Sequence, residues 1–183
     1  MAGKWHHLMW IVAVLSGFCA VFAFANFPSQ RWVWTTMLAS SGTWFLVEAY
    51  RNLRNRIVLN ALVFGFVVSC ILFAMEEMAR WLKLWSLYGG SFLFFGIPAE
   101  LVAVYFFCSV AWALYIPRKF DWGHSIIEVV MVGFLLTLVE YILGWQWMIV
   151  GYGAGWTSAH TFIKYLVLLS LCHCLWYCVF GRE

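Results

Sequence analysis

Long apolar runs dominate the chain, and short stretches with charged, proline or glycine residues separate them. A transmembrane helix needs about 20 predominantly apolar residues. The pattern therefore predicts an all-α, polytopic membrane protein, a bundle of about six transmembrane helices at residues 8–26, 32–50, 57–76, 91–115, 125–143 and 160–180. Only short tails and loops remain, so we expect residues 1–183 to form a single transmembrane domain with any function inside the bundle or at its rim.

Composition excludes several classes of function. Hydrophobic residues make up 65% of the chain and charged residues only 10%, whereas soluble domains carry about 25% charged residues. This balance excludes a soluble enzyme, a disordered tail and a nucleic-acid-binding protein. The net charge of +3 is small, and the basic residues lie between apolar runs, where they indicate topology.

The positions of Lys and Arg predict the orientation, because these residues concentrate in cytoplasmic loops. In the predicted topology, one side of the membrane holds Lys4, Arg51, Arg54, Arg56, Arg118, Lys119 and Arg182. The other side holds Arg31, Arg80 and Lys83. We therefore expect an integral protein of the cell membrane with both termini in the cytoplasm.

Glu100 lies well inside a predicted span. It falls about nine residues into the 91–115 run, or about 13 Å deep at 1.5 Å per residue. A carboxyl group buried at such a depth is expected to be protonated and able to donate a proton. The alternative is a neutral Glu100 that hydrogen-bonds across helices. Pro98 removes a backbone donor two residues earlier, which predicts a helix kink beside this acid.

Other ionisable groups are predicted to gather near Glu100. Alternating topology places four of them in the half of the bilayer opposite the termini: Glu76, Glu77, Glu140 and Lys164. Such groups usually face the interior of a bundle, so we expect them around one cavity. The alternative for Glu140 and Lys164 is an interhelical ion pair. The step of 24 residues from Glu76 to Glu100 recurs from Glu140 to Lys164, which favours two three-helix repeats.

The sequence predicts no metal site and no cofactor. Cys172, His173, Cys174 and Cys178 lie close together, but a helix cannot direct three consecutive side chains at one ion. Glycine-rich phosphate loops and other nucleophile or zinc motifs are absent from the sequence. Any chemistry is therefore expected from acidic and aromatic side chains alone.

The run from Arg56 to Tyr115 resembles the integral-membrane lycopene cyclase domain of carotenoid biosynthesis. In that family an acidic residue ends one helix, a Trp follows in the loop, and a Pro-x-Glu-Glu/Asp motif with aromatics lies in the next helix. The corresponding residues here are Glu76-Glu77, Trp85, and Pro98-Ala99-Glu100 followed by Tyr105-Phe106-Phe107. The second acidic position of the motif is Leu101, and the C-terminal half has no Pro-x-Glu.

The resemblance implies ring closure of a polyene by proton donation, attack of a neighbouring alkene on the carbocation, and loss of a proton, without net redox. Glu100 would be the general acid, and Glu76 or Glu77 would take the final proton. Aromatic faces would stabilise the cation. The residues expected to bind the substrate are Trp85, Tyr88, Pro98, Trp112 and Glu140.

Three functions remain open at this point. The first is a membrane enzyme, an isomerase or intramolecular lyase that acts on a carotenoid or other isoprenoid by acid–base chemistry. The alternative is a non-catalytic structural or accessory subunit of a larger membrane complex, in which the acids are paired. The third is a transporter or proton-conducting bundle with a file of acids. The expected partners are membrane lipid or carotenoid and other subunits in a homo- or hetero-oligomer.

Overall fold

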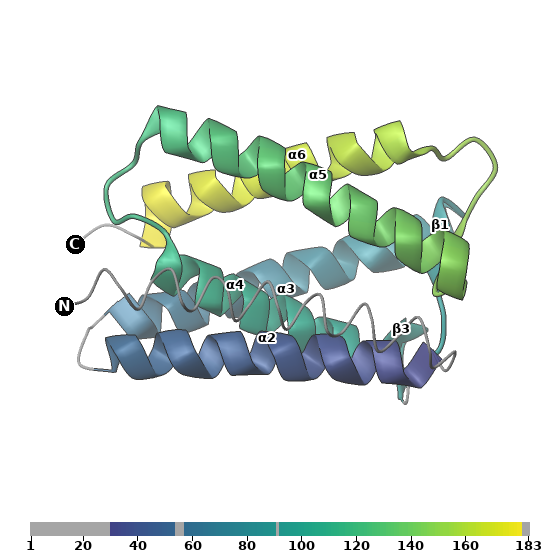
Figure 1. The fold of residues 1–183 in the computed structure, drawn as a ribbon, viewed down its shortest axis with the longest axis horizontal. Coiled ribbons are helices and arrows are strands. Elements are labelled where there is room, and N and C mark those ends of the chain that lie inside the picture. Colours follow the sequence, from purple (N-terminus) through teal and green to yellow (C-terminus); the bar gives the residue numbers. More distant parts are fainter. Residues whose placement is uncertain (1–29, 54–56, 91, 181–183) are drawn as a thin grey trace.

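The computed structural model describes residues 30–53, 57–90 and 92–180. The predicted span 8–26 therefore lies outside the described residues. Helices dominate, as the sequence predicts, and Figure 1 shows their order: α2 (Gln30–Asn52), α3 (Ile57–Trp81), α4 (Ala99–Tyr115), α5 (Trp122–Trp147) and α6 (Ser158–Leu175), which ends in a π-helical turn η1 (Trp176–Phe180). The short strands are β1 (Trp85–Leu87), β2 (Leu93–Phe94), β3 (Ile97–Pro98) and β4 (Val150–Tyr152).

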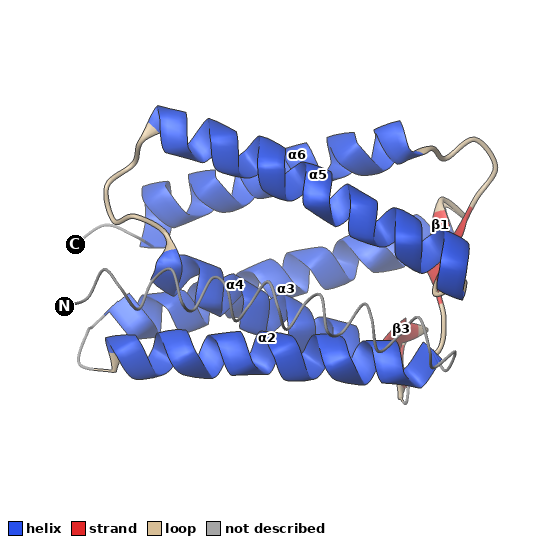
Figure 2. Ribbon diagram, viewed as in Figure 1, coloured by secondary structure: helices blue, strands red, loops and turns tan. Residues whose placement is uncertain are grey.

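The helices lie in two layers, with α2, α3 and α4 in one and α5 and α6 in the other (Figure 1). Strands β1 and β4 pair antiparallel and join the layers at one end, with Trp85 opposite Tyr152. At the other end, Trp176 of η1 packs edge-on against Phe64 of α3, with ring centroids 5.3 Å apart. The layers are thus held together at their two ends, and Figure 2 shows the helices running between these ends.

Local sequence explains where the second layer begins and ends. Asp121 caps α5 by accepting a hydrogen bond from the backbone N–H of His124 at 2.9 Å. Helix α5 ends at Trp147, and the capping residue that follows, Met148, has a left-handed φ of 49°. Thr157 and His160 form a reciprocal capping box at the start of α6.

Three of the described helical segments are long and apolar enough to cross a membrane: Ile57–Trp81, Trp122–Gly144 and Ser158–Phe180. Helix α4 is apolar but shorter. Large apolar side chains such as Phe66 on α3 and Phe134 on α5 are exposed, as expected for surfaces that face lipid. Basic residues lie at the helix ends, with Arg118 and Lys119 exposed between α4 and α5. These features associate the protein with a membrane.

The prediction of one helix over 91–115 is wrong, because a β-hairpin occupies its first part. Strand β2 pairs with β3, and Gly96 adopts a φ of +84° in the turn, a conformation that glycine permits without steric cost. Pro98 has an extended ψ of 123° and precedes the first residue of α4. The predicted helix kink at Pro98 is therefore also wrong, and Glu100 lies in the first turn of α4.

The other described spans differ mainly in their ends. Helix α3 continues five residues beyond the predicted end at Glu76, as far as Trp81. The all-α prediction also missed the ribbon of β1 and β4. Both strands follow the end of a long helix, and their three-residue length leaves no alternating hydrophobic pattern in the sequence to detect.

Candidate functional site

A cavity of about 350 Å³ lies between the two layers and has an almost entirely apolar lining. Every described α-helix contributes residues to the lining. The cavity therefore forms only when the two layers have packed together. The residues from the first layer and β1 are Trp34, Met37, Trp44, Phe64, Val68, Leu72, Glu76, Trp85, Leu87, Leu101, Val104, Tyr105, Cys108, Ser109 and Trp112. Those from the second layer and β4 are Val132, Leu136, Val139, Glu140, Leu143, Val150, Lys164, Tyr165, Leu168, Leu169 and Cys172.

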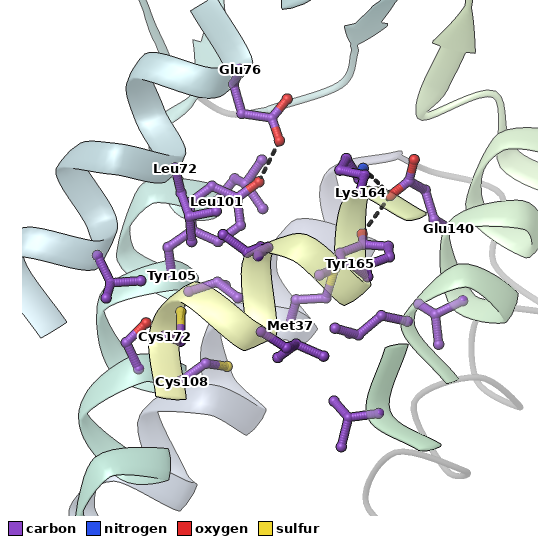
Figure 3. Close-up of a pocket in the computed structure, with 18 of the residues that line it drawn as sticks. Met37, Leu72, Glu76, Leu101, Tyr105, Cys108, Glu140, Lys164, Tyr165 and Cys172 are labelled. Atoms are coloured by element: carbon purple, nitrogen blue, oxygen red, sulfur yellow. Dashed lines mark hydrogen bonds and ion pairs between the residues drawn. The ribbon is translucent and has the colours of Figure 1, made fainter. Parts of the chain in front are cut away.

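Glu76 projects into the cavity from α3 at the end near the β1–β4 ribbon (Figure 3). Its side chain is buried, with 5% of the residue exposed. The indole N–H of Trp85 donates to Oε2 at 2.6 Å, and the hydroxyl of Tyr105 donates to Oε1 at 2.7 Å. Both carboxyl oxygens are therefore held, one from β1 and one from α4.

Glu140 lies on the opposite wall, on α5, and is also buried (Figure 3). Its Oε2 is 2.6 Å from the ammonium of Lys164, and the same oxygen accepts a hydrogen bond from the hydroxyl of Tyr165. The hydroxyl of Tyr152, on β4, donates to Oε1 at 3.2 Å. Burial, and then the charge of Glu140, raises the pKa of Tyr152, so this phenol stays protonated and able to donate.

The two carboxyl groups have matching surroundings. Each lies near the end of a helix that leads into the ribbon. Each accepts a hydrogen bond from an aromatic residue of the following strand, Trp85 or Tyr152, and another from a tyrosine of the next helix, Tyr105 or Tyr165. The units α3–β1–α4 and α5–β4–α6 thus present equivalent carboxyl groups to one cavity.

Trp85 and Lys164 connect the two halves of this polar cluster. The ammonium of Lys164 lies 4.7 Å from the centroid of the Trp85 ring, whose N–H holds Glu76. The same ammonium lies 4.5 Å from the ring of Tyr165. The site therefore contains two buried carboxyl groups and one ammonium group, with aromatic faces between them.

The structure brings together four of the residues predicted for the site: Glu76, Trp85, Trp112 and Glu140 line the cavity. The predicted Glu140–Lys164 ion pair is also present. Glu77, next to Glu76, instead forms an ion pair with Arg80 at 2.7 Å and does not line the cavity.

Three other predicted residues lie away from the cavity. Glu100 lies in the first turn of α4 and is absent from the lining, whereas its neighbour Leu101 lines the cavity, so Glu100 projects from a different face of the helix. Pro98 is buried against Gly90. A Cβ atom added to Gly90 would lie 2.7 Å from the Cβ of Pro98. Tyr88 packs its ring over Gly151 on the ribbon, and half of it is exposed.

Sequence reasoning missed the three tyrosines that hold the carboxyl groups: Tyr105, Tyr152 and Tyr165. Tyr105 lies in the aromatic run after Glu100, and Tyr165 directly follows Lys164. Tyrosine is common at membrane interfaces, so nothing in the sequence distinguished these from anchoring residues.

The opposite end of the cavity contains Trp112, whose indole N–H donates to Oε1 of Glu128 at 2.6 Å. Oε2 of the same carboxyl group lies 3.5 Å from Nε2 of the buried His173 and 3.4 Å from Nε2 of His124. No group of metal-binding side chains was found among residues 30–53, 57–90 and 92–180.

Aliphatic and aromatic side chains line most of the cavity, which suits an apolar molecule. The charged groups of the lining lie together at one end, where they could exchange protons with such a molecule. We compared the chain with protein-family models, with curated protein sequences and with solved structures, and none of them matches it.

Proposed function

We propose that this protein is a membrane-embedded enzyme that acts on a carotenoid or other isoprenoid lipid by proton-initiated cyclisation or isomerisation. One observation carries the proposal: the buried carboxyl groups of Glu76 and Glu140 face one apolar, aromatic-lined cavity from opposite walls. Their aromatic hydrogen-bond partners match, but only Glu140 has an ammonium group, that of Lys164, at 2.6 Å. Paired carboxyl groups that differ in this way are a common basis for separate acid and base roles. The apolar lining suits a hydrocarbon substrate.

Glu76 is the acid in this proposal. With all three charged groups ionised, Glu76, Glu140 and Lys164 carry a net charge of −1, which is unfavourable for buried side chains in a mainly apolar lining. One added proton makes the cluster neutral. The ammonium of Lys164 lies 2.6 Å from Glu140, so Glu140 remains the anion and the proton resides on Glu76.

Glu140 is the base. Glu76 protonates a terminal carbon–carbon double bond, and the neighbouring double bond attacks the resulting tertiary carbocation, which closes a ring and moves the positive charge. Glu140 then removes a proton from the carbon next to the cation. The C–H bond beside a carbocation is strongly acidic, so even an ion-paired carboxylate is basic enough. The product is an isomer of the substrate. Exchange of protons with solvent then restores the proton on Glu76 and removes the one on Glu140 before the next turnover, and the reaction needs no cofactor.

Aromatic faces at the same end stabilise the cation. Trp85 lies beside Glu76 through its 2.6 Å hydrogen bond, and Trp34 also lines the cavity. Cation–π attraction stabilises a desolvated cation by about 2 kcal/mol. Trp85 already binds the ammonium of Lys164 in this way, so its face is positioned for positive charge.

This site modifies what the resemblance to the lycopene cyclase domain implies. Trp85 keeps its proposed role, Glu76 takes the role of general acid that the resemblance gives to Glu100, and Glu140 takes the role of base. Tyr105 and Tyr165 hold the two carboxyl groups. The equivalent units α3–β1–α4 and α5–β4–α6 support a duplicated architecture. We further propose a six-span protein, with 8–26 as its first span, α2 and α4 as crossing helices, and both termini in the cytoplasm.

Deuterium incorporation tests the reaction. The full chain, reconstituted in lipid vesicles in D₂O, is incubated with lycopene, squalene or geranylgeraniol, and the lipids are analysed by mass spectrometry. A proton-initiated reaction yields an isomer that carries solvent deuterium. Glu76→Gln removes the acid and is expected to abolish deuterated product, while Glu140→Gln strongly reduces it.

Glu77→Gln and Glu100→Gln are the matched controls, since each removes a carboxyl group that was predicted for the site but lies outside the cavity lining. Both are expected to retain wild-type deuterium incorporation. The proposal fails if folded wild-type protein gives no deuterated isomer from any of the three lipids, or if Glu76→Gln is as active as the wild type.

The second candidate is a non-catalytic subunit of a larger membrane complex. The observation in its favour is the number of paired acids, because Glu48 pairs with Arg51, Glu77 with Arg80, and Glu140 with Lys164. In that case no lipid is converted, and Glu76→Gln changes only stability. A folded protein that is inactive on all three lipids would favour this candidate.

A further inference from the structure

The cavity is elongated along the helices. On α3 its lining extends from Phe64 to Glu76, a distance of about 18 Å at 1.5 Å per residue. On α4 it extends from Leu101 to Trp112, or about 17 Å. All charged lining groups are at the ribbon end. Such a shape accommodates a linear chain lying parallel to the helices, and a compact fused-ring molecule would leave much of it empty.

Trp112 closes the end away from the ribbon. Its ring stacks on Phe64 of α3, with centroids 5.7 Å apart, and meets the ring of His173 on α6 edge-on at 5.0 Å. Its N–H is bound to Glu128 of α5. The indole on α4 therefore contacts three other helices and extends across the space between the two layers.

These contacts fix the indole in place. The hydrogen bond to Glu128 is 2.6 Å long, and the carboxyl group that accepts it has only 15% of its side chain exposed. His173, with 6% of its side chain exposed, packs against the same ring. A tryptophan that stacks on one ring, meets a second ring edge-on and is hydrogen-bonded through its N–H is a rigid barrier, whereas an unbonded side chain would move aside for a longer ligand.

We propose that Trp112 is the end stop of a binding site for linear isoprenoids and sets the longest chain that fits. This inference rests on the proposed function: the reacting end of the chain lies at Glu76 and Glu140, and its tail extends toward Trp112. The substrate is then an acyclic isoprenoid whose length matches the distance between the polar cluster and Trp112. Trp112 is a specificity-determining residue and takes no part in proton transfer.

Binding of a length series tests the end stop without requiring catalysis. The full chain in detergent micelles is titrated with geraniol, farnesol, geranylgeraniol and geranylfarnesol, and bound ligand is measured by native mass spectrometry. We expect the wild-type affinity to fall at least tenfold beyond one length in the series. Trp112→Ala is expected to move this limit to the next longer alcohol, while Trp112→Phe, which keeps a ring, keeps the limit.

Trp122→Ala is the matched control, because this tryptophan lies at the start of α5 and is 73% exposed; it leaves the length limit unchanged. A second measurement uses wild-type protein alone, so that it does not depend on the folding of a variant. Farnesol carrying a diazirine at its hydroxyl end, opposite the reacting terminal double bond, is irradiated in the site, and the labelled peptide is sequenced. Labelling at Trp112 or Phe64 is expected.

Three results overturn the end stop: no length limit in the wild type, a limit that a folded Trp112→Ala variant retains, or labelling only on lipid-facing residues. The two proposals fail separately. A length limit that depends on Trp112, without deuterated product, refutes the enzyme but keeps the end stop. Deuterated product without a length limit keeps the enzyme and refutes the end stop.

Discussion

Replacing Lys164 by methionine tests whether the ion pair with Glu140 holds α5 and α6 together beside the ribbon. The two side chains are 9% and 8% exposed, and the ammonium and carboxyl oxygen lie 2.6 Å apart. Removing one partner of a buried pair costs about 3–5 kcal/mol, because the other charge stays buried. The variant also loses cation–π contacts with Trp85 and Tyr165, which together contribute about 1–2 kcal/mol for this buried ammonium group.

A double-mutant cycle separates these contributions. Lys164→Met is expected to lower the free energy of unfolding by about 4 kcal/mol. The variant Lys164→Met/Glu140→Gln restores most of this loss, because it leaves no buried charge and loses only the cation–π contacts. The coupling energy between the two positions should therefore be about 3 kcal/mol, well above the value of about 0.6 kcal/mol that is typical of interhelical hydrogen bonds in membranes.

The assay is reversible unfolding of the micellar protein by sodium dodecyl sulfate, and circular dichroism monitors the loss of helix. A coupling energy near 0.6 kcal/mol would refute the reasoning, since it would mean that Lys164 and Glu140 find equivalent partners in the unfolded state. Tyr152→Phe provides a control. It removes a neutral donor to Glu140 at 3.2 Å and should cost only about 1 kcal/mol.

Three further predictions follow from single positions. Gly65→Ala should destabilise the protein by about 1–3 kcal/mol in the same assay, because the added methyl group would lie 2.3 Å from Cγ2 of Val110; Gly42→Ala, with no contact closer than 3.8 Å, should be neutral or stabilising. Gly96→Ala should cost about 1–2 kcal/mol through its φ of +84°, and an unchanged unfolding midpoint would contradict the hairpin geometry. Trp85→Phe removes the 2.6 Å hydrogen bond to Glu76 and should lower the rate of deuterium incorporation at least tenfold, whereas wild-type rates would exclude a role for this indole.

The sequence predicted the helices wherever an apolar run is long and uniform. Helix α3 follows from the apolar residues after Ile57, and its true end at Trp81 lies five residues beyond the prediction. The start of α4 was misplaced because the 92–98 segment is as apolar as a helix, and only the left-handed φ of Gly96 and the extended backbone of Pro98 distinguish it. A hydrophobic run by itself does not separate a hairpin from a helix.

The site was predictable to the extent that it depends on depth in the membrane. Alternating topology was enough to place Glu76, Glu140 and Lys164 at one level. The error at Glu100 has the same origin, since its depth was counted from a helix start that the structure places eight residues later, at Ala99. The tyrosines Tyr105 and Tyr165 depend on the rotation of α4 and α6 about their axes, which tertiary packing decides.

The ribbon of β1 and β4 has a consequence for biosynthesis. Trp85 pairs with Tyr152, so the two strands are separated in the chain by α4 and α5. Contacts between distant segments form late, because the intervening chain must first be ordered. During synthesis α2, α3 and α4 can pack as soon as they enter the membrane, but Glu76 then faces an open side. The cavity closes only after α6 has emerged and the ribbon has formed, so Glu76 stays on an open face of the nascent chain until the protein is nearly complete.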